Sequence, residues 1–288
     1  MLSAAEMRRA LITVALSVLG VGCRRPTGLP SLDAGVPANV SETERSPVDA
    51  ITDASTELAP LEGEWIERWT MPSGAVVFVT RPQGATRARP IVIAVHGAED
   101  HADWACSEWR ATVGGFAWVL CPQGVPLRSG YAWSSAEMIA ARAFEARDML
   151  QARYGPYVAP GPLLYGGFSQ GATLASSVVS THPGQFDRVV MVEAGHTPLS
   201  PSGVIFGLKK GQVGMATISC STGGCAAFSS ELLMAARNAS FDLLTNDGGR
   251  RGHVFDGVTI KSLGDTLVKM VAADPRFEGL ANAVHGGP

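Results

Sequence analysis

Short apolar segments recur along residues 61–275 and alternate with segments of helical periodicity. The run Ile-Val-Ile-Ala-Val at residues 91–95 is apolar throughout, which is typical of a strand buried on both faces. Further strands are predicted at residues 74–80, 116–120, 162–166, 189–192, 215–219 and 241–245, and helices at 135–154, 172–179, 229–239 and 260–273. Because strands alternate with helices, the pattern predicts an α/β fold whose mostly parallel sheet is covered on both faces.

The first residues follow a different pattern. Arg8 and Arg9 precede an apolar stretch at residues 10–22, which is followed by Cys23. A positive segment, a short apolar core and small residues before a cut predict a signal peptide over residues 1–22. The approach to Cys23 resembles a bacterial lipobox, although Gly20 stands where such a box usually has leucine. We therefore expect an exported lipoprotein of the cell envelope, anchored through Cys23. The alternative is an ordinary secreted protein with an incidental cysteine.

Residues 24–60 contain no Phe, Trp or Tyr and are rich in Pro, Ser, Ala, Asp and Thr. Such a segment buries too little apolar surface to offset its ordering entropy. The predicted organisation is a signal peptide at residues 1–22, a disordered tether at 23–60, a folded domain at 61–275 and a flexible tail at 276–288.

Composition and charge argue against some classes of function. Hydrophobic residues make up 46% of the 288 residues, which is ample for a large core, and the formal net charge of -3 argues against a nucleic-acid binder. No run of eighteen apolar residues occurs, so the mature chain is not expected to span a membrane.

The chain contains five cysteines, an odd number for an oxidising compartment. Lipidation of Cys23 would leave four to pair, and we predict the disulfides Cys106–Cys121 and Cys220–Cys225. Their spacing resembles no tetrahedral zinc motif, and no metal or cofactor is implied.

The strongest chemical signal is Gly167-Phe168-Ser169-Gln170-Gly171, between the strand at 162–166 and the helix at 172–179. A Gly-x-Ser-x-Gly sequence between strand and helix is the signature of a nucleophile elbow. The strained turn leaves no room for side chains at the two glycines. The positive end of the following helix would face charge that develops at Ser169.

Together with the His96-Gly97 turn after the strand at 91–95 and the late Gly252-His253 pair, this motif resembles the α/β-hydrolase superfamily. The likeness extends from Trp65 to Ala273 and is greatest to small secreted esterases of the dienelactone-hydrolase and feruloyl- or polyhydroxybutyrate-esterase type. It implies a three-layer α/β-hydrolase fold.

The resemblance also suggests roles. Ser169 would be the nucleophile, and it needs a base within hydrogen-bond reach. His253 lies in the loop after the last predicted strand, where these families place their base. The oxyanion hole would use the backbone amides of Gln170 and Ala98.

The triad acid departs from the family pattern. The usual aspartate is expected in the loop at 220–225, which contains no carboxylate and has Gly224 at that place. Glu193 directly follows the strand at 189–192 and preserves the chain order of serine, acid and histidine. The alternatives are Asp247, another acid, or no working acid, and Glu193 could instead be held by backbone donors at a strand end.

Two aromatic residues, Tyr131 and Trp133, fall on loops where ligands bind in open α/β folds, and they either line a substrate pocket or cap the core. The sequence thus predicts a serine esterase that cleaves small-molecule or polymer carboxylic esters through an acyl-enzyme. A catalytically impaired binding or surface protein is the main alternative, because the usual aspartate is missing. A peptidase of the prolyl-oligopeptidase type is disfavoured, since no propeller domain fits this length.

Overall fold

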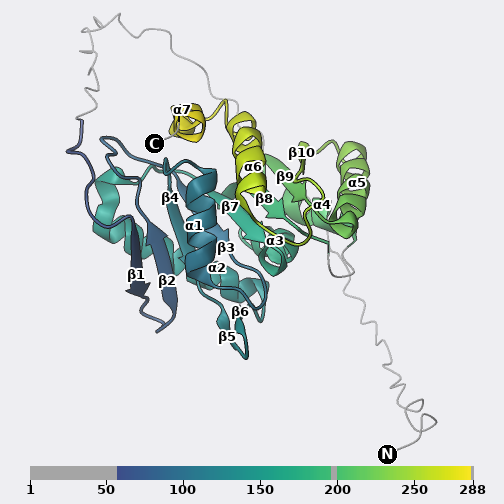
Figure 1. Ribbon diagram of the computed structural model, residues 1–288, viewed down its shortest axis with the longest axis horizontal. Coiled ribbons are helices and arrows are strands. Elements are labelled where there is room, and N and C mark those ends of the chain that lie inside the picture. The colour runs from purple at the N-terminus through teal and green to yellow at the C-terminus, as the bar shows by residue number, and fades with distance from the viewer. Residues whose placement is uncertain (1–56, 196–199, 287–288) are drawn as a thin grey trace, which may run out of the picture. The chain divides into compact units, whose positions relative to one another are not determined.

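The computed structural model describes residues 57–195 and 200–286. Its centre is an eight-stranded sheet in the order β1-β2-β4-β3-β7-β8-β9-β10, beside a separate β5–β6 hairpin (Figure 1). The strands are β1 (Ile66–Thr70), β2 (Val76–Thr80), β3 (Ile91–Val95), β4 (Trp118–Pro122), β5 (Val125–Leu127), β6 (Gly130–Ala132), β7 (Leu163–Phe168), β8 (Phe186–Val192), β9 (Met215–Cys220) and β10 (Leu243–Asp247).

The sheet is parallel from β4 to β10, and antiparallel only where β2 pairs with β1 and with β4. The predicted mostly parallel sheet is therefore confirmed. All five residues of β3 are buried, as its continuous apolar run requires.

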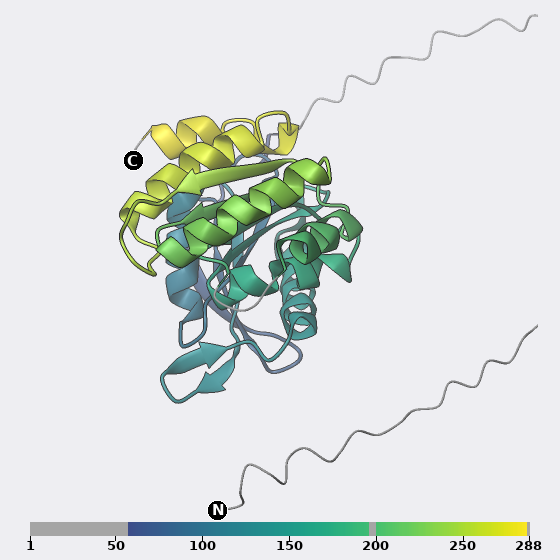
Figure 2. The ribbon, with the colours of Figure 1, turned by 90° about the vertical axis from the view of Figure 1, so that its right-hand side faces the viewer.

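Helices cover both faces of the sheet. The helices α1 (Ala102–Thr112), α6 (Gly257–Met270) and α7 (Leu280–His285) pack on one face. The helices α2 (Ala136–Tyr154), α3 (Gln170–Ser180), α4 (Pro201–Lys210) and α5 (Gly223–Asn238) pack on the other. Figure 2 shows the β10 edge of the sheet with α5, drawn in green, beside it.

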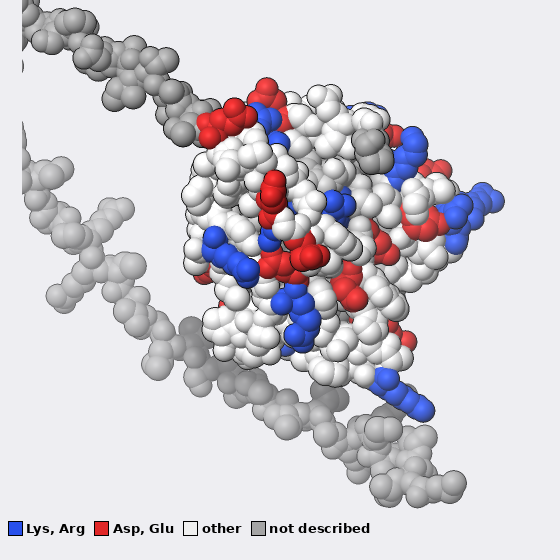
Figure 3. Space-filling model, turned by 60° about the vertical axis from the view of Figure 1, so that its left-hand side comes forward, with Lys and Arg blue, Asp and Glu red and all other residues white. Residues whose placement is uncertain are grey.

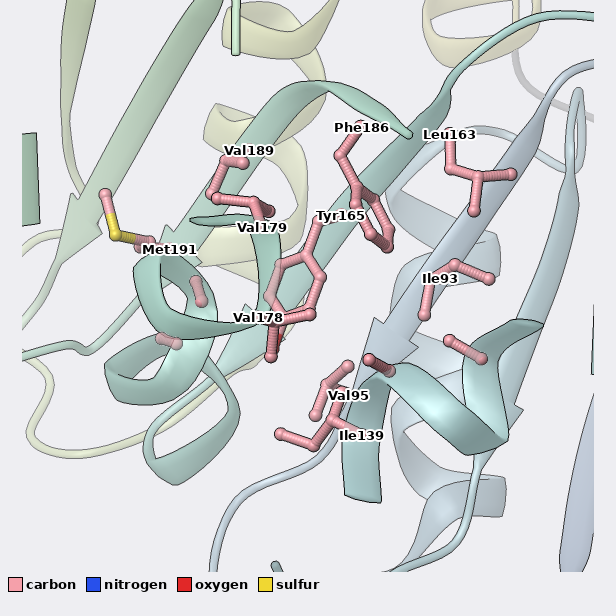
Figure 4. Packing of buried hydrophobic residues seen from close by; sticks show 14 of the residues in the cluster. Ile93, Val95, Ile139, Leu163, Tyr165, Val178, Val179, Phe186, Val189 and Met191 are labelled. Carbon is pink, nitrogen blue, oxygen red and sulfur yellow. The ribbon is translucent and has the colours of Figure 1, made fainter. Parts of the chain in front are cut away.

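The larger core cluster lies between the sheet and the α2–α5 layer. Figure 4 shows Tyr165 of β7 among Val178 of α3 and Phe186 of β8. The Tyr165 hydroxyl is buried and donates a 2.7 Å hydrogen bond to Gly171 O. Packing and this hydrogen bond together fix the start of α3 against the sheet.

Both predicted disulfides are present. Cys106 of α1 is joined to Cys121 of β4, with Cα atoms 5.6 Å apart, and Cys220 is joined to Cys225, with Cα atoms 5.3 Å apart. Both separations lie in the usual range for a disulfide.

The ends of the folded domain differ from expectation. The prediction of a flexible tail at residues 276–288 is wrong for residues 276–286. Phe277 and Leu280 are buried in the core cluster on the α1 and α6 face of the sheet. The last tether residues also contact the domain, since Leu58 N donates to Thr86 O and the Tyr157 hydroxyl donates to Ala59 O. The signal peptide, Cys23 and the tether before residue 57 lie outside the described residues.

No helix in the described part of the chain is long and apolar enough to cross a membrane. On the face drawn in Figure 3, acidic and basic side chains are interspersed. That face therefore carries no extended basic surface of the kind that nucleic-acid binders use.

Candidate active site

Ser169 occupies a strained turn between β7 and α3. Its backbone has φ 50° and ψ −111°, a conformation that residues with a Cβ rarely adopt. A Cβ at Gly167 would lie 2.6 Å from Ala172 N, and one at Gly171 would lie 2.4 Å from Val95 O. Both glycines are therefore required by close backbone approach, and the turn lifts the Ser169 side chain out of the sheet.

His253 meets the serine from the loop after β10. Its Nε2 lies 2.9 Å from Ser169 Oγ, which is a hydrogen-bonding distance. The imidazole packs against Phe168, with ring centroids 5.0 Å apart, and its side chain is 40% exposed. The two residues are 84 positions apart in sequence, so only the fold brings this serine and this base together.

Glu193 approaches the other side of the same imidazole. Its Oε2 lies 3.6 Å from His253 Nδ1, and its side chain is only 1% exposed. This separation is longer than a hydrogen bond, as such contacts often are before a substrate is bound. Glu193 follows β8 directly, with φ 55°.

The buried carboxylate of Glu193 is held by the loop between β9 and α5. Oε1 accepts hydrogen bonds from Ser221 N, from Ser221 Oγ at 2.8 Å and from Thr222 N at 3.3 Å, while Oε2 accepts one from Thr222 Oγ1 at 2.7 Å. Burial alone would raise the pKa of Glu193, but the neighbouring His253 and these donors outweigh it and lower the pKa to about 2. Glu193 is therefore an anion at neutral pH.

The other acid considered from the sequence lies elsewhere. Asp247 Oδ1 accepts a 2.8 Å hydrogen bond from Gly249 N, and its side chain is exposed at the end of β10. Gly224, which stands where the family aspartate was expected, belongs to the first turn of α5. Among these positions, the fold brings only Glu193 into contact with His253.

The backbone amides of Gln170 and Ala98 are the two candidate oxyanion donors. Gln170 is the first residue of α3, and Ala98 lies in the turn after β3. The turn passes close to the nucleophile, because a Cβ on Gly97 would lie 3.1 Å from Ser169 Cβ. Within residues 57–195 and 200–286, no hydrogen bond occupies the amide of Ala98 or of Gln170.

His96 shapes the turn that carries Ala98. Its ring is fully buried; Nε2 accepts a 2.9 Å hydrogen bond from Gly124 N, so Nδ1 donates to Gly97 O at 2.6 Å. Burial lowers the pKa of His96, against the opposing bond to Gly97, and favours the neutral ring. These two hydrogen bonds tie the His96 ring to the turn after β3 and to Gly124.

The two aromatic residues take different positions. Trp133 is 4% exposed and packs in the larger core cluster, and its indole N–H donates a 3.0 Å hydrogen bond to His96 O. Tyr131 is half-buried, with its ring edge-on to His101 at 5.4 Å, and its N–H donates to Asp100 O. It lies next to the turn after β3.

A cavity of about 830 Å³ lies between α5 and β10 and borders the loop that holds Glu193. Ser221, Thr222, Asp247 and Arg250 are among its polar lining residues. In the described part of the chain, no group of three or more His, Cys, Asp or Glu side chains is arranged to bind a metal.

Sequence reasoning missed the hydrogen-bonding roles of Ser221 and Thr222. Their only sequence signal is a pair of hydroxyl residues one position after the strand predicted at 215–219. Nothing in that spacing indicates a contact with Glu193, which is 28 residues earlier.

No protein-family model and no curated protein sequence matches this chain. Solved structures do resemble it. A substrate-bound fluorophosphonate-binding serine hydrolase of Staphylococcus aureus matches with a TM-score of 0.55 at 11% identity, covering 72% of this chain and 97% of that one. An S-formylglutathione hydrolase from the same organism matches with a TM-score of 0.53 at 11% identity and the same coverage.

A carboxylesterase from Mesorhizobium loti matches with a TM-score of 0.50 at 16% identity, over 74% of this chain and the whole of that one. At these identities the likeness shows the fold alone. The fold is that of the α/β-hydrolases, as the sequence motifs predicted.

Proposed function

We propose that this protein is a serine esterase that cleaves carboxylic esters through an acyl-enzyme intermediate. The observation that carries the proposal is the 2.9 Å contact between Ser169 Oγ and His253 Nε2 at a strained strand-to-helix turn. A serine hydroxyl becomes a useful nucleophile only with such a base. The buried Glu193 carboxylate beside His253 Nδ1 supports a complete relay.

In the first half of the reaction, Ser169 Oγ attacks the ester carbonyl carbon and passes its proton to His253 Nε2. The resulting imidazolium is stabilised by the Glu193 anion. The negative oxygen of the tetrahedral intermediate is bound by the amides of Gln170 and Ala98, at the positive end of α3. When the intermediate collapses, the ester C–O bond breaks and His253 gives its proton to the departing alcohol.

In the second half, His253 Nε2 takes a proton from water, which attacks the acyl-serine carbonyl carbon. Collapse of the second intermediate releases the carboxylic acid and returns the proton to Ser169 Oγ. His253 therefore acts in turn as the proton acceptor and the proton donor in both halves of the reaction.

The test is hydrolysis of short-chain p-nitrophenyl esters by the full chain, with labelling by a fluorophosphonate probe. Ser169→Ala should abolish both, because it removes the attacking oxygen. Ser177→Ala is the matched control, since Ser177 is exposed on the same helix, α3, and it should retain both activities. Undiminished labelling of Ser169→Ala would refute the assignment, and an inactive, unlabelled parent would favour a binding or surface role.

We also propose that the enzyme is exported and held at the cell envelope by a lipid on Cys23. The apolar segment before Cys23 and the aromatic-free residues 24–60 support this organisation. Metabolic labelling with palmitate should be lost in Cys23→Ser. An unlabelled parent would argue for simple secretion.

A further inference from the structure

The loop between β9 and α5 makes contacts that a simple connection does not need. Ser221 Oγ and Thr222 Oγ1 each donate to one oxygen of Glu193, at 2.8 and 2.7 Å. Both residues lie inside the short ring closed by the Cys220–Cys225 disulfide. Every hydrogen bond from this loop to Glu193 therefore comes from within the disulfide ring.

Ser221 also connects the loop to the segment that carries the base. Its hydroxyl lies 2.8 Å from Gly252 O, the carbonyl of the residue before His253. A hydroxyl has one proton, so the Glu193 carboxylate and the Gly252 carbonyl compete for it. Ser221 thus lies against both the acid and the base segments.

Thr222 connects the loop to a helix. Thr222 is the N-cap of α5, and its Oγ1 accepts a 3.3 Å hydrogen bond from Cys225 N while donating to Glu193. The Glu193 carboxylate consequently faces the N-terminus of a 16-residue helix, where negative charge is stabilised. The start of α5 and the position of the acid are fixed by the same side chain.

We propose that the disulfide-closed loop, acting through Ser221 and Thr222, positions the Glu193 carboxylate toward His253 Nδ1. Ser221 and Thr222 are positioning residues, because their hydroxyls donate to Glu193 and would act on His253 through that carboxylate. The Cys220–Cys225 bond restricts the backbone that carries both donors. The inference rests on the proposed esterase function and names the residues that make its acid effective.

The sharpest test of Thr222 is a pair of substitutions in two backgrounds. Thr222→Val keeps the side-chain shape but removes the hydroxyl, and Thr222→Ser keeps the hydroxyl. We expect Thr222→Val to lower kcat about 10–100-fold with little change in KM, because a small displacement of a relay group is costly. Thr222→Ser should restore most of the rate.

In the Glu193→Gln background, Thr222→Val and Ser221→Ala should lower kcat by less than about twofold. Residues that act through Glu193 have little left to position once its charge is gone, so the effects are not additive. An equal loss in both backgrounds would overturn the proposal, because the loop would then act independently of the acid.

The Cys106–Cys121 disulfide, which lies outside the loop, is the control for the Cys220–Cys225 disulfide. Cys106–Cys121 has a sequence separation of 15 and Cys220–Cys225 one of 5, so removing the former should lower Tm more on chain-entropy grounds. We expect Cys220→Ala/Cys225→Ala to lower kcat at least about tenfold, and Cys106→Ala/Cys121→Ala to leave the kcat of the folded protein nearly unchanged.

Two outcomes separate failure of this inference from failure of the proposed function. If the parent hydrolyses esters and labels at Ser169, but Thr222→Val and the Cys220/Cys225 variant keep full kcat, the positioning role is wrong and the esterase stands. If the parent neither hydrolyses esters nor is labelled, the esterase function and the positioning role are both wrong. Near-ultraviolet circular dichroism on each variant excludes loss of fold as the cause of a lower rate.

Discussion

Gln170 and Trp133 are joined by two hydrogen bonds of opposite direction. The Trp133 N–H donates to Gln170 Oε1 at 2.9 Å, and Gln170 Nε2 donates to Trp133 O at 3.0 Å. Gln170, whose backbone amide is proposed to bind the oxyanion, is thereby held by its side chain against the segment after β6. Trp133 in turn bonds to His96 O, so this contact links both proposed oxyanion donors to one buried framework.

Replacing Gln170 by Leu should therefore weaken both the fold and the reaction. The backbone N–H and C=O of Trp133 lose their partners, which costs about 1–3 kcal/mol of unfolding free energy. We expect kcat to fall about tenfold, because the Gln170 amide remains but is held less firmly. Urea denaturation and ester kinetics measure the two effects, with exposed Gln151→Leu on α2 as control. A fully active and fully stable Gln170→Leu variant would show that the Gln170–Trp133 hydrogen bonds do not support the oxyanion donors.

The acid assignment is tested by a pair of isosteric changes. Glu193→Gln should keep the fold and lower kcat about 10²–10⁴-fold, because the imidazolium loses its partner and the imidazole tautomer is no longer fixed. Asp247→Asn should cost little, since Asp247 contacts Gly249 N instead of His253. Steady-state kinetics on both variants decide the matter. The reverse pattern would transfer the role to Asp247.

Stability should depend on pH through Glu193. Its pKa of about 2 in the folded protein lies below the ordinary value of 4.5 expected when unfolded. A depressed pKa contributes stability above the unfolded value, and the contribution disappears as pH falls from about 4.5 to about 2. At about 1.4 kcal/mol per pKa unit, the contribution is on the order of 3 kcal/mol. Urea denaturation at pH 7 and pH 3 should show a larger loss in the parent than in Glu193→Gln, and equal losses would contradict the pKa.

The C-terminal segment should contribute to stability. Phe277 is 5% exposed and packs in the same core cluster as α1 and α6. Phe277→Ala should lower the unfolding free energy by about 3–5 kcal/mol, because it leaves a cavity. Glu278→Gln, at a side chain that is 74% exposed, should change it by less than about 0.5 kcal/mol. Thermal melting of the two variants makes the comparison, and a silent Phe277→Ala would restore the idea of a loose tail.

The buried elements could be predicted from sequence, and the marginal ones could not. The predicted strand at 91–95 coincides with β3, because a run of five apolar residues is typical of a strand buried on both faces. No strand was predicted for β1, whose Glu67 and Arg68 interrupt the apolar pattern, and α4 begins with a Pro-Ser-Gly sequence typical of a loop. The glycine pair at 223–224 likewise predicted a loop, although Thr222 caps α5 there.

In the candidate site, too, some residues could be predicted from local sequence and others could not. Ser169 was found from a local motif, and His253 from its place after the last strand. Glu193 could be ranked above Asp247 only by its place at the carboxyl end of the strand at 189–192, because its contacts join the end of β8 to a loop beyond β9. Such contacts depend on how neighbouring parallel strands end at one edge of the sheet, and a single sequence contains no direct record of them.

Two helices begin at the two ends of the proposed relay: α3 at Ser169 and α5 at the loop that holds Glu193. During attack, charge would alternate along the relay, negative at the oxyanion, positive on the imidazole and negative on the carboxylate. Both negative ends face helix N-termini, whose dipoles belong to the backbone and need not reorient as charge moves. We therefore expect the chemical step to be nearly insensitive to ionic strength, because its stabilising field comes from fixed amides and not from mobile ions or surface side chains.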